Sequence, residues 1–190
     1  MREGGDTGDV ARLDRLCRDK ALAEIALAEQ LLPGDRVVRG AGDELADVLL
    51  LKGEPGPDDL AALRALAGAD GVAAGRALDA LGLSAARFAV CTRVGDAGAP
   101  VRTERLRLIT EAVDPRLVVA LDPVAGTDFA DAYGVVAPAC GVLARVCGRR
   151  MLIVDGLEAS LADEALKRRV WRQLRALNPA ADTGKHSERP

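Results

Sequence analysis

The chain has 190 residues, of which 49% are hydrophobic and only 2% aromatic, and its formal net charge is −3. This length is sufficient for one domain with a core of mostly Leu, Val and Ala side chains, and the negative charge excludes a global attraction to nucleic acid. Since no apolar run is long enough to span a membrane and the N-terminus lacks the apolar segment of a signal peptide, a cytoplasmic protein is expected.

The first half of the chain alternates helical and extended patterns. Residues 1–9 are rich in Gly and Asp and are expected to form a flexible tail before a single domain over residues 10–177. Apolar residues recur at helical spacing over residues 10–32, until Pro33-Gly34 ends the run. The pattern then predicts a short extended piece at residues 37–38, strands over 47–51 and 87–92, and helices over 58–67 and 72–81.

The second half repeats this alternation. Helices are predicted over residues 103–113, 124–133 and 164–177, and a strand over 117–121. Residues 142–146 and 151–154 are predicted to be a hairpin or two neighbouring strands, and residues 178–190 a polar, flexible tail. Short apolar strands between helices indicate a three-layer α/β/α domain with a central, mostly parallel sheet of four or five strands.

The four cysteines, Cys17, Cys91, Cys140 and Cys147, include no closely spaced pair. Zinc sites and iron–sulfur clusters normally contain at least one such pair. Small buried thiols, kept reduced, are therefore expected, with no metal site and no cofactor.

One strand runs directly into a Gly/Pro turn that carries a carboxylate. The turn is Gly53-Glu54-Pro55-Gly56, and it follows Leu49-Leu50-Leu51-Lys52. In open α/β sheets, ligands bind at the carboxyl ends of the strands, so Glu54 is a candidate catalytic residue. The alternative is a turn residue that accepts backbone N–H bonds.

The order of these elements and motifs resembles the uracil-DNA glycosylase superfamily, and within it the iron–sulfur (family 4-like) enzymes, from about residue 37 to residue 177. Three segments carry the resemblance. Gly53-Glu54-Pro55-Gly56 corresponds to the family's Gly-Glu-Ala-Pro-Gly motif. Residues 65–71 (Ala-Leu-Ala-Gly-Ala-Asp-Gly) correspond to its Pro-Phe-Val-Gly-x-Ala-Gly segment. Residues 114–121 (Asp-Pro-Arg-Leu-Val-Val-Ala-Leu) correspond to its Pro-x-x-Ile-Val-x-Leu-Gly strand, with Asp122 in place of the Gly.

The chain departs from the family where chemistry is expected. The resemblance places Leu66 where a Phe stacks on uracil, Thr92 where an Asn reads the base edge, and Asp155-Gly156 where His-Pro-Ser begins. The cluster cysteines have no equivalents. The resemblance thus implies a base pocket formed by Gly53, Pro55, Gly56, Leu66, Gly68, Thr92 and Asp155, without the His that stabilises a departing base.

Basic side chains crowd the last predicted helix. Arg residues number 22 against four Lys in the whole chain, a ratio typical of compositional bias, so only clustered Arg count as a signal. Lys167, Arg168, Arg169 and Arg172 form such a cluster and are candidate phosphate contacts. A solvated helix face is the alternative.

Three functions are compatible with this sequence. The favoured one is a catalytically inactive binding or partner module of the glycosylase fold, linked to DNA repair, with weak DNA binding or a DNA-repair protein as its partner. The second is a divergent DNA glycosylase that cleaves the N-glycosidic bond of a damaged base with Glu54. The third is a protein–protein adaptor without a nucleic-acid role. Whether the chain is an enzyme is left open by the residues alone.

Overall fold

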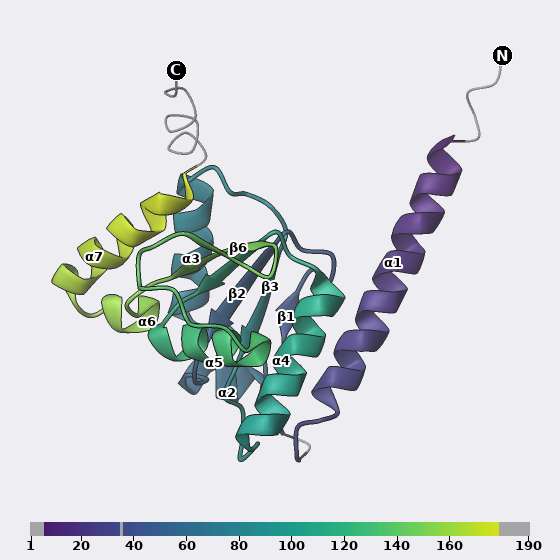
Figure 1. The fold of residues 1–190 in the computed structure, drawn as a ribbon, viewed down its shortest axis with the longest axis horizontal. Coiled ribbons are helices and arrows are strands. Elements are labelled where there is room, and N and C mark those ends of the chain that lie inside the picture. The colour runs from purple at the N-terminus through teal and green to yellow at the C-terminus, as the bar shows by residue number, and fades with distance from the viewer. Residues whose placement is uncertain (1–5, 35, 179–190) are drawn as a thin grey trace.

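The computed structural model describes residues 6–34 and 36–178. Helices cover both faces of one mixed sheet (Figure 1), which is the three-layer α/β/α architecture predicted from the sequence. The sheet has six strands, more than predicted. They are β1 (Ala41–Gly42), β2 (Val48–Lys52), β3 (Arg87–Cys91), β4 (Leu117–Ala120), β5 (Ala144–Val146) and β6 (Arg149–Ile153).

The strands lie in the order β1-β3-β2-β4-β6-β5. The four inner strands are parallel, while β1 and β5 pair with their neighbours in the antiparallel sense at the two edges. The pairing of β5 with β6 confirms the hairpin alternative for the segments that end the sheet. The two-residue strand β1 was not predicted, because a pair such as Ala41-Gly42 carries no strand pattern.

Seven α-helices are present in the described residues. They are α1 (Asp6–Glu29), α2 (Pro57–Ala62), α3 (Ala69–Ala80), α4 (Ala99–Val113), α5 (Pro123–Tyr133), α6 (Leu157–Ser160) and α7 (Glu164–Leu174), and a 3₁₀ turn, η1 (Arg175–Leu177), continues α7. In the described part of the chain, no helix is both long and apolar enough to cross a membrane.

Alternate strand residues build two cores, one on each face of the sheet. Leu50 of β2 points into the core under α3, α6 and α7. Leu49 and Leu51 point into the core under α1, α4 and α5. All five residues of β2 are buried, as expected for an inner strand of a parallel sheet that is covered on both faces.

Three segments differ from the sequence predictions. Helix α2 ends at Ala62, short of the predicted residue 67, because Leu63 adopts a left-handed conformation with φ of 53°. Helix α1 begins at Asp6, within the segment predicted as a flexible tail, and α6 was not predicted. Residues 1–5 and 179–190, the rest of the two predicted tails, lie outside the described residues.

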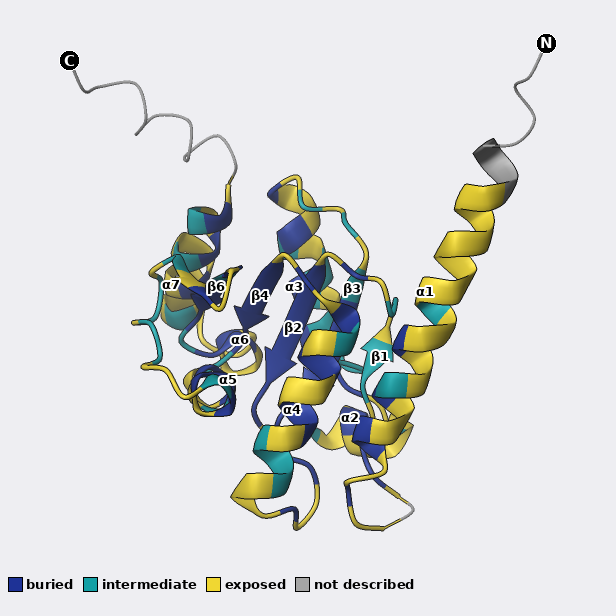
Figure 2. Cartoon of the chain, turned by 45° about the vertical axis from the view of Figure 1, so that its right-hand side comes forward, coloured by how far each residue is buried: buried dark blue, intermediate teal, exposed yellow. Residues whose placement is uncertain are grey.

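Helix α1 packs on the domain only through its C-terminal half (Figure 2). Ala21, Ile25 and Ala28 are buried there. Glu29 pairs with Arg105 of α4 at 2.9 Å (Oε1–Nη2), and both side chains are at most 3% exposed. The N-terminal half projects away from the sheet, and its Val10, Leu13 and Leu16 side chains are exposed.

Candidate functional site

A pocket of about 340 Å³ lies at the carboxyl ends of the parallel strands. Its walls come from the loops after β2, β4 and β6. The helices that follow β2 cover one face of the sheet, whereas α5, which follows β4, covers the other. The pocket thus lies at the point where the strand order reverses, which is the usual ligand site of open α/β sheets. The lining residues are Lys52, Glu54, Asp70, Leu121, Asp122, Val124, Gly156, Leu157, Glu158 and Ala159.

The ammonium group of Lys52 lies at the floor of this pocket among three carboxylates. Its Nζ atom is 2.8 Å from Asp59 Oδ2, 2.6 Å from Asp70 Oδ2 and 2.9 Å from Glu158 Oε2. A lysine ammonium has three N–H donors, so these three contacts account for all of them. Lys52 therefore has no donor left for a ligand while Glu158 stays in place.

Two of the three carboxylates that contact Lys52 are buried, and the third is half exposed. The side chains of Lys52, Asp59 and Asp70 are each at most 5% exposed, whereas that of Glu158 is 53% exposed. Burial alone would lower the pKa of Lys52, but its hydrogen bonds to the three carboxylates raise that pKa above the usual value. Burial would likewise raise the pKa of Asp59, yet Lys52 and two backbone N–H groups hold it below its usual value. Lys52 and Asp59 are thus both charged at neutral pH.

Backbone N–H groups near the two aspartates in sequence hold the carboxylates in place. Asp59 accepts hydrogen bonds from Gly56 N at 2.9 Å and from Ala67 N at 2.8 Å, and Asp70 accepts one from Gly71 N at 2.9 Å. A Cβ atom on Gly56 would lie 2.7 Å from Glu158 Oε1 and 3.0 Å from Lys52 Nζ. The last glycine of the Gly-Glu-Pro-Gly turn therefore leaves the space in which the network forms.

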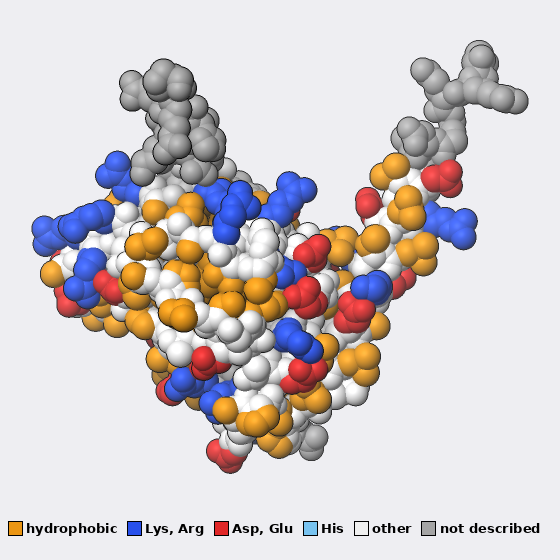
Figure 3. Space-filling model, viewed as in Figure 1, with side chains coloured by type: hydrophobic (Ala, Val, Ile, Leu, Met, Phe, Trp, Pro, Cys, Tyr) orange, Lys and Arg blue, Asp and Glu red, His pale blue; other side chains and the backbone are white. Residues whose placement is uncertain are grey.

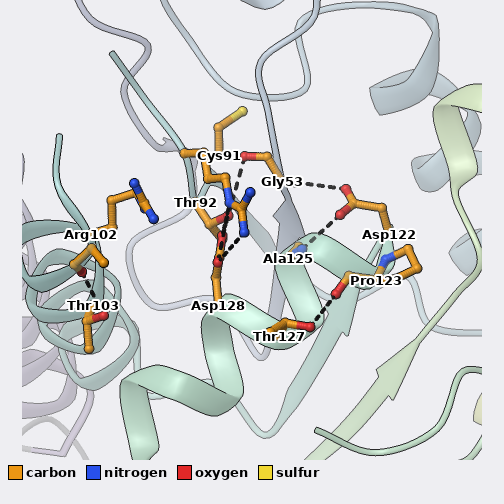
Figure 4. A network of polar contacts seen from close by, with 12 residues as sticks. Gly53, Cys91, Thr92, Arg102, Thr103, Asp122, Pro123, Ala125, Thr127 and Asp128 are labelled. Atoms are coloured by element: carbon orange, nitrogen blue, oxygen red, sulfur yellow. Dashed lines mark hydrogen bonds and ion pairs between the residues drawn. The ribbon is translucent and has the colours of Figure 1, made fainter. Parts of the chain in front are cut away.

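Asp122 joins the turn after β2 to the first turn of α5. One carboxylate oxygen accepts a hydrogen bond from Gly53 N at 2.8 Å, and the other accepts one from Ala125 N at 2.8 Å (Figure 4). Asp122 is thus the N-cap of α5. Both oxygens are engaged within the protein, so its role at the pocket wall is structural.

Thr92 lies between Asp128 of α5 and the turn after β2 (Figure 4), with its Oγ1 3.3 Å from Gly53 O. Its hydroxyl donates to Asp128 Oδ2 at 2.6 Å. Arg93 binds the same carboxylate with two nitrogens, at 3.0 Å each (Nε–Oδ2 and Nη2–Oδ1). The position that the resemblance assigns to base reading is therefore part of an ion-pair network between β3 and α5.

The remaining predicted site residues are distributed over different parts of the surface. Glu54 lines the pocket, exposed, with no hydrogen bond or ion pair to any described residue. Leu66 lines a separate hollow with Arg64 and Ala89. Asp155 pairs with Arg169 at 2.7 Å. The structure thus places Glu54 in the pocket wall, with Gly53, Pro55 and Gly56 in the same turn beside it. Gly68 caps α3 next to Asp70. Thr92 contacts Gly53 and Asp155 precedes the lining residue Gly156, but neither lines the pocket, and Leu66 lies in the separate hollow.

The basic residues of α7 are exposed but partly paired. Lys167 contacts Glu164 at 3.1 Å, Arg168 donates to the backbone oxygen of Glu164 at 3.1 Å, and Arg169 pairs with Asp155. Arg172 is exposed in the last turn. A phosphate contact by the first three would compete with these bonds.

Sequence reasoning missed Lys52, Asp59, Asp70 and Glu158 as a unit. One signal was present, because Lys52 is one of only four Lys in an Arg-rich chain and ends an otherwise apolar strand. Among the described residues, no group of three or more His, Cys, Asp or Glu side chains is arranged to hold a metal ion. All four cysteines are free, but only Cys91 is buried; Cys17 and Cys147 are exposed, so the prediction of buried thiols is wrong for these two. Burial raises the pKa of the Cys91 thiol to about 12.

No protein-family model and no curated protein matches the sequence of this chain.

Proposed function

We propose that this protein is a non-excising member of the uracil-DNA glycosylase type that works as a binding module linked to DNA repair. The observation that carries the proposal is the Lys52 network at the pocket floor, in which every ammonium donor is bound to a carboxylate of the protein itself. The link to repair rests on the resemblance of the motif order and on nothing else.

Base excision needs a group that stabilises the negative charge on the departing base. The pocket instead has four carboxylates, those of Glu54, Asp70, Asp122 and Glu158, around one lysine that is already bound. Such walls repel both a departing anion and a DNA phosphate. Leu66, which the resemblance assigns to stacking, lines a separate hollow. Thr92, which it assigns to base reading, donates its hydroxyl hydrogen to Asp128.

One observation favours a divergent active glycosylase as the second candidate. Glu54 is exposed at the pocket and makes no hydrogen bond or ion pair with a described residue, so its carboxylate is available to orient a water molecule. This candidate lacks a donor for the departing base unless Glu158 releases Lys52.

An incision assay separates the two candidates. The protein is incubated with single- and double-stranded oligonucleotides that carry uracil, hypoxanthine or xanthine, and alkali then cleaves any abasic site. We expect no strand scission. Scission that is lost in Glu54→Gln but kept in Glu104→Gln, a matched change at an exposed glutamate of α4, would contradict the proposal and establish the second candidate.

DNA binding by the basic helix is tested separately. If Arg168, Arg169 and Arg172 contact phosphates, affinity for DNA should fall steeply with salt and be lost in the triple Ala variant. Binding unchanged by the triple substitution would assign DNA contacts to another surface, and absence of binding would favour the protein–protein adaptor.

A further inference from the structure

An apolar groove of about 320 Å³ lies between α3, α6 and α7, on the surface that α7 presents to solvent. Ala73 and Ala77 of α3 form one wall, and Trp171 of α7 forms part of the other. The remaining apolar lining comes from Leu157, Leu161, Val170 and Leu174. This groove is distinct from the Lys52 pocket, although Leu157 contributes to both.

Trp171 lies half in this groove and half in solvent. Its side chain is 41% exposed, as is that of Leu161, and it is the only tryptophan of the chain. Tryptophan is the residue that most often anchors protein–protein interfaces. A half-exposed Trp beside aliphatic groove walls is therefore a surface suited to a partner.

The edge of the groove is strongly basic. Residues 164–177 contain five basic side chains and one acidic side chain, Glu164. Lys167 and Arg168 line the groove itself, together with Glu164, which pairs with Lys167. Arg172 and Arg175 follow on the exposed surface of the same helix and its 3₁₀ extension. Figure 3 shows Lys and Arg side chains gathered along the α7 edge of the molecule.

We propose that this groove binds an acidic amphipathic segment of another protein, with apolar side chains against Trp171 and carboxylates toward Arg168 and Arg172. The proposal rests on the binding role proposed above and names the partner's chemistry. A partner helix with one apolar stripe fits a groove between helices. Opposite charges along the edge select the acidic partner and increase the association rate.

Charge argues against the chain's own segments as occupants. The exposed half of α1, residues 9–20, has three acidic and four basic side chains. Residues 178–190 have two of each. Neither complements a basic edge. A nucleic acid would pair with the arginines, but the aliphatic walls offer only Trp171 as a stacking surface for bases.

Trp171 reports directly on occupation of the groove. The probe is a synthetic peptide of about four helical turns, with Leu at i, i+3, i+4 and i+7 spacing and Glu at the other positions. We expect saturable quenching or a blue shift of Trp171 emission, weakened by salt. A scrambled peptide of the same composition, which presents no apolar stripe, should bind at least about tenfold more weakly.

One variant tests the apolar wall of the groove, and a second tests its basic edge. Ala73→Glu places a carboxylate in the groove wall, and the charge reversal Arg168→Glu/Arg172→Glu inverts the edge; each should weaken peptide binding at least about tenfold. Ala23→Glu, the same change at an exposed position of α1, should leave binding unchanged. Far-UV circular dichroism verifies that each variant is folded. Should Ala73→Glu unfold the domain, Arg168→Glu/Arg172→Glu still tests the proposal, because it leaves the apolar residues of the groove unchanged.

Four outcomes would overturn the proposal. The first two are absence of peptide binding and equal binding of the designed and scrambled peptides. The other two are a Trp171 response to oligo(dT) but not to the peptide, and a concentration-dependent dimer in sedimentation that Ala73→Glu abolishes. These results are separable from the function proposed above. Base release in the incision assay would refute that function while leaving peptide binding intact, and absence of both base release and peptide binding would refute only the groove.

Discussion

Replacing Lys52 by methionine tests whether the buried network depends on its single cation. The substitution leaves an unbranched side chain that is one atom shorter, and it leaves Asp59 and Asp70, which are 1% and 4% exposed, as buried carboxylates without a counter-ion. Breaking a buried ion pair by removing one partner costs about 3–5 kcal/mol. Three backbone N–H donors still serve the two carboxylates, so we expect a loss within this range in the free energy of unfolding at pH 7.

The loss of stability caused by Lys52→Met should depend on pH in a defined direction. In the native protein the pKa of Asp59 is lowered, so its contribution to stability is present above the unfolded-state pKa of about 3.9 and is lost as the pH falls through the lower folded value. Without Lys52, the strongest remaining influence on the pKa of Asp59 is burial, which raises it. The folded variant then binds protons more readily than the unfolded chain, and its deficit relative to the native protein should shrink as the pH falls from 7 toward 4.

Urea unfolding followed by circular dichroism and by Trp171 emission measures both effects. Lys20→Met is the matched control, because Lys20 pairs with Glu24 on the surface, where the two side chains are 71% and 41% exposed, and its loss should cost less than about 1 kcal/mol. Lys52→Met/Asp70→Asn should recover part of the loss. A cost below about 1 kcal/mol for Lys52→Met, or a deficit that grows on acidification, would refute the reasoning.

The same unfolding assay checks two further predictions. Arg105→Met should lower the free energy of unfolding by about 3–5 kcal/mol, because it leaves Glu29 buried without a counter-ion. Arg105→Met/Glu29→Gln should cost less than the single change. An equal or larger cost for the double variant would show that packing, not charge, dominates. Gly71→Ala should lower the free energy of unfolding by about 1–3 kcal/mol, because the new Cβ would meet the backbone oxygen of Leu66. Gly75→Ala lies in the same helix and faces only the flexible Arg87 side chain, so it should be neutral or stabilising by up to about 1 kcal/mol. A destabilisation by Gly75→Ala as large as that by Gly71→Ala would contradict this.

The layered fold was accessible from the sequence because each of its inner strands contains a short run of apolar residues. β2 and β4 are buried on both faces, and such strands read as continuous apolar runs. The edge strand β1 and the four-residue α6 were not accessible, since tertiary contacts rather than a local pattern define such short pieces. The early end of α2 depends on the left-handed Leu63, a conformation that no residue preference indicates for leucine.

The candidate site was predictable only in its central turn. The Gly-Glu-Pro-Gly pattern placed Glu54 correctly at the carboxyl end of β2. The partners of Lys52 come from three separate segments, so their meeting depends on the topology and on the length of each loop. Thr92 and Asp155 looked available in sequence, yet each is engaged with a charged residue of a helix, Asp128 and Arg169, that no local pattern connects with it.

The overhanging half of α1 divides the chain into regions of unequal local stability. Its backbone hydrogen bonds are surrounded by solvent, and a helical piece of that length is marginal without packing. Amide protons of residues 9–20 should therefore exchange through local fraying, orders of magnitude faster than those of β2 or β4, which open only with the whole domain. Proteolytic nicking should begin on this arm and stop near Ala21, which is buried and follows Arg18, the residue that pairs with Asp43 and Glu44 of the body.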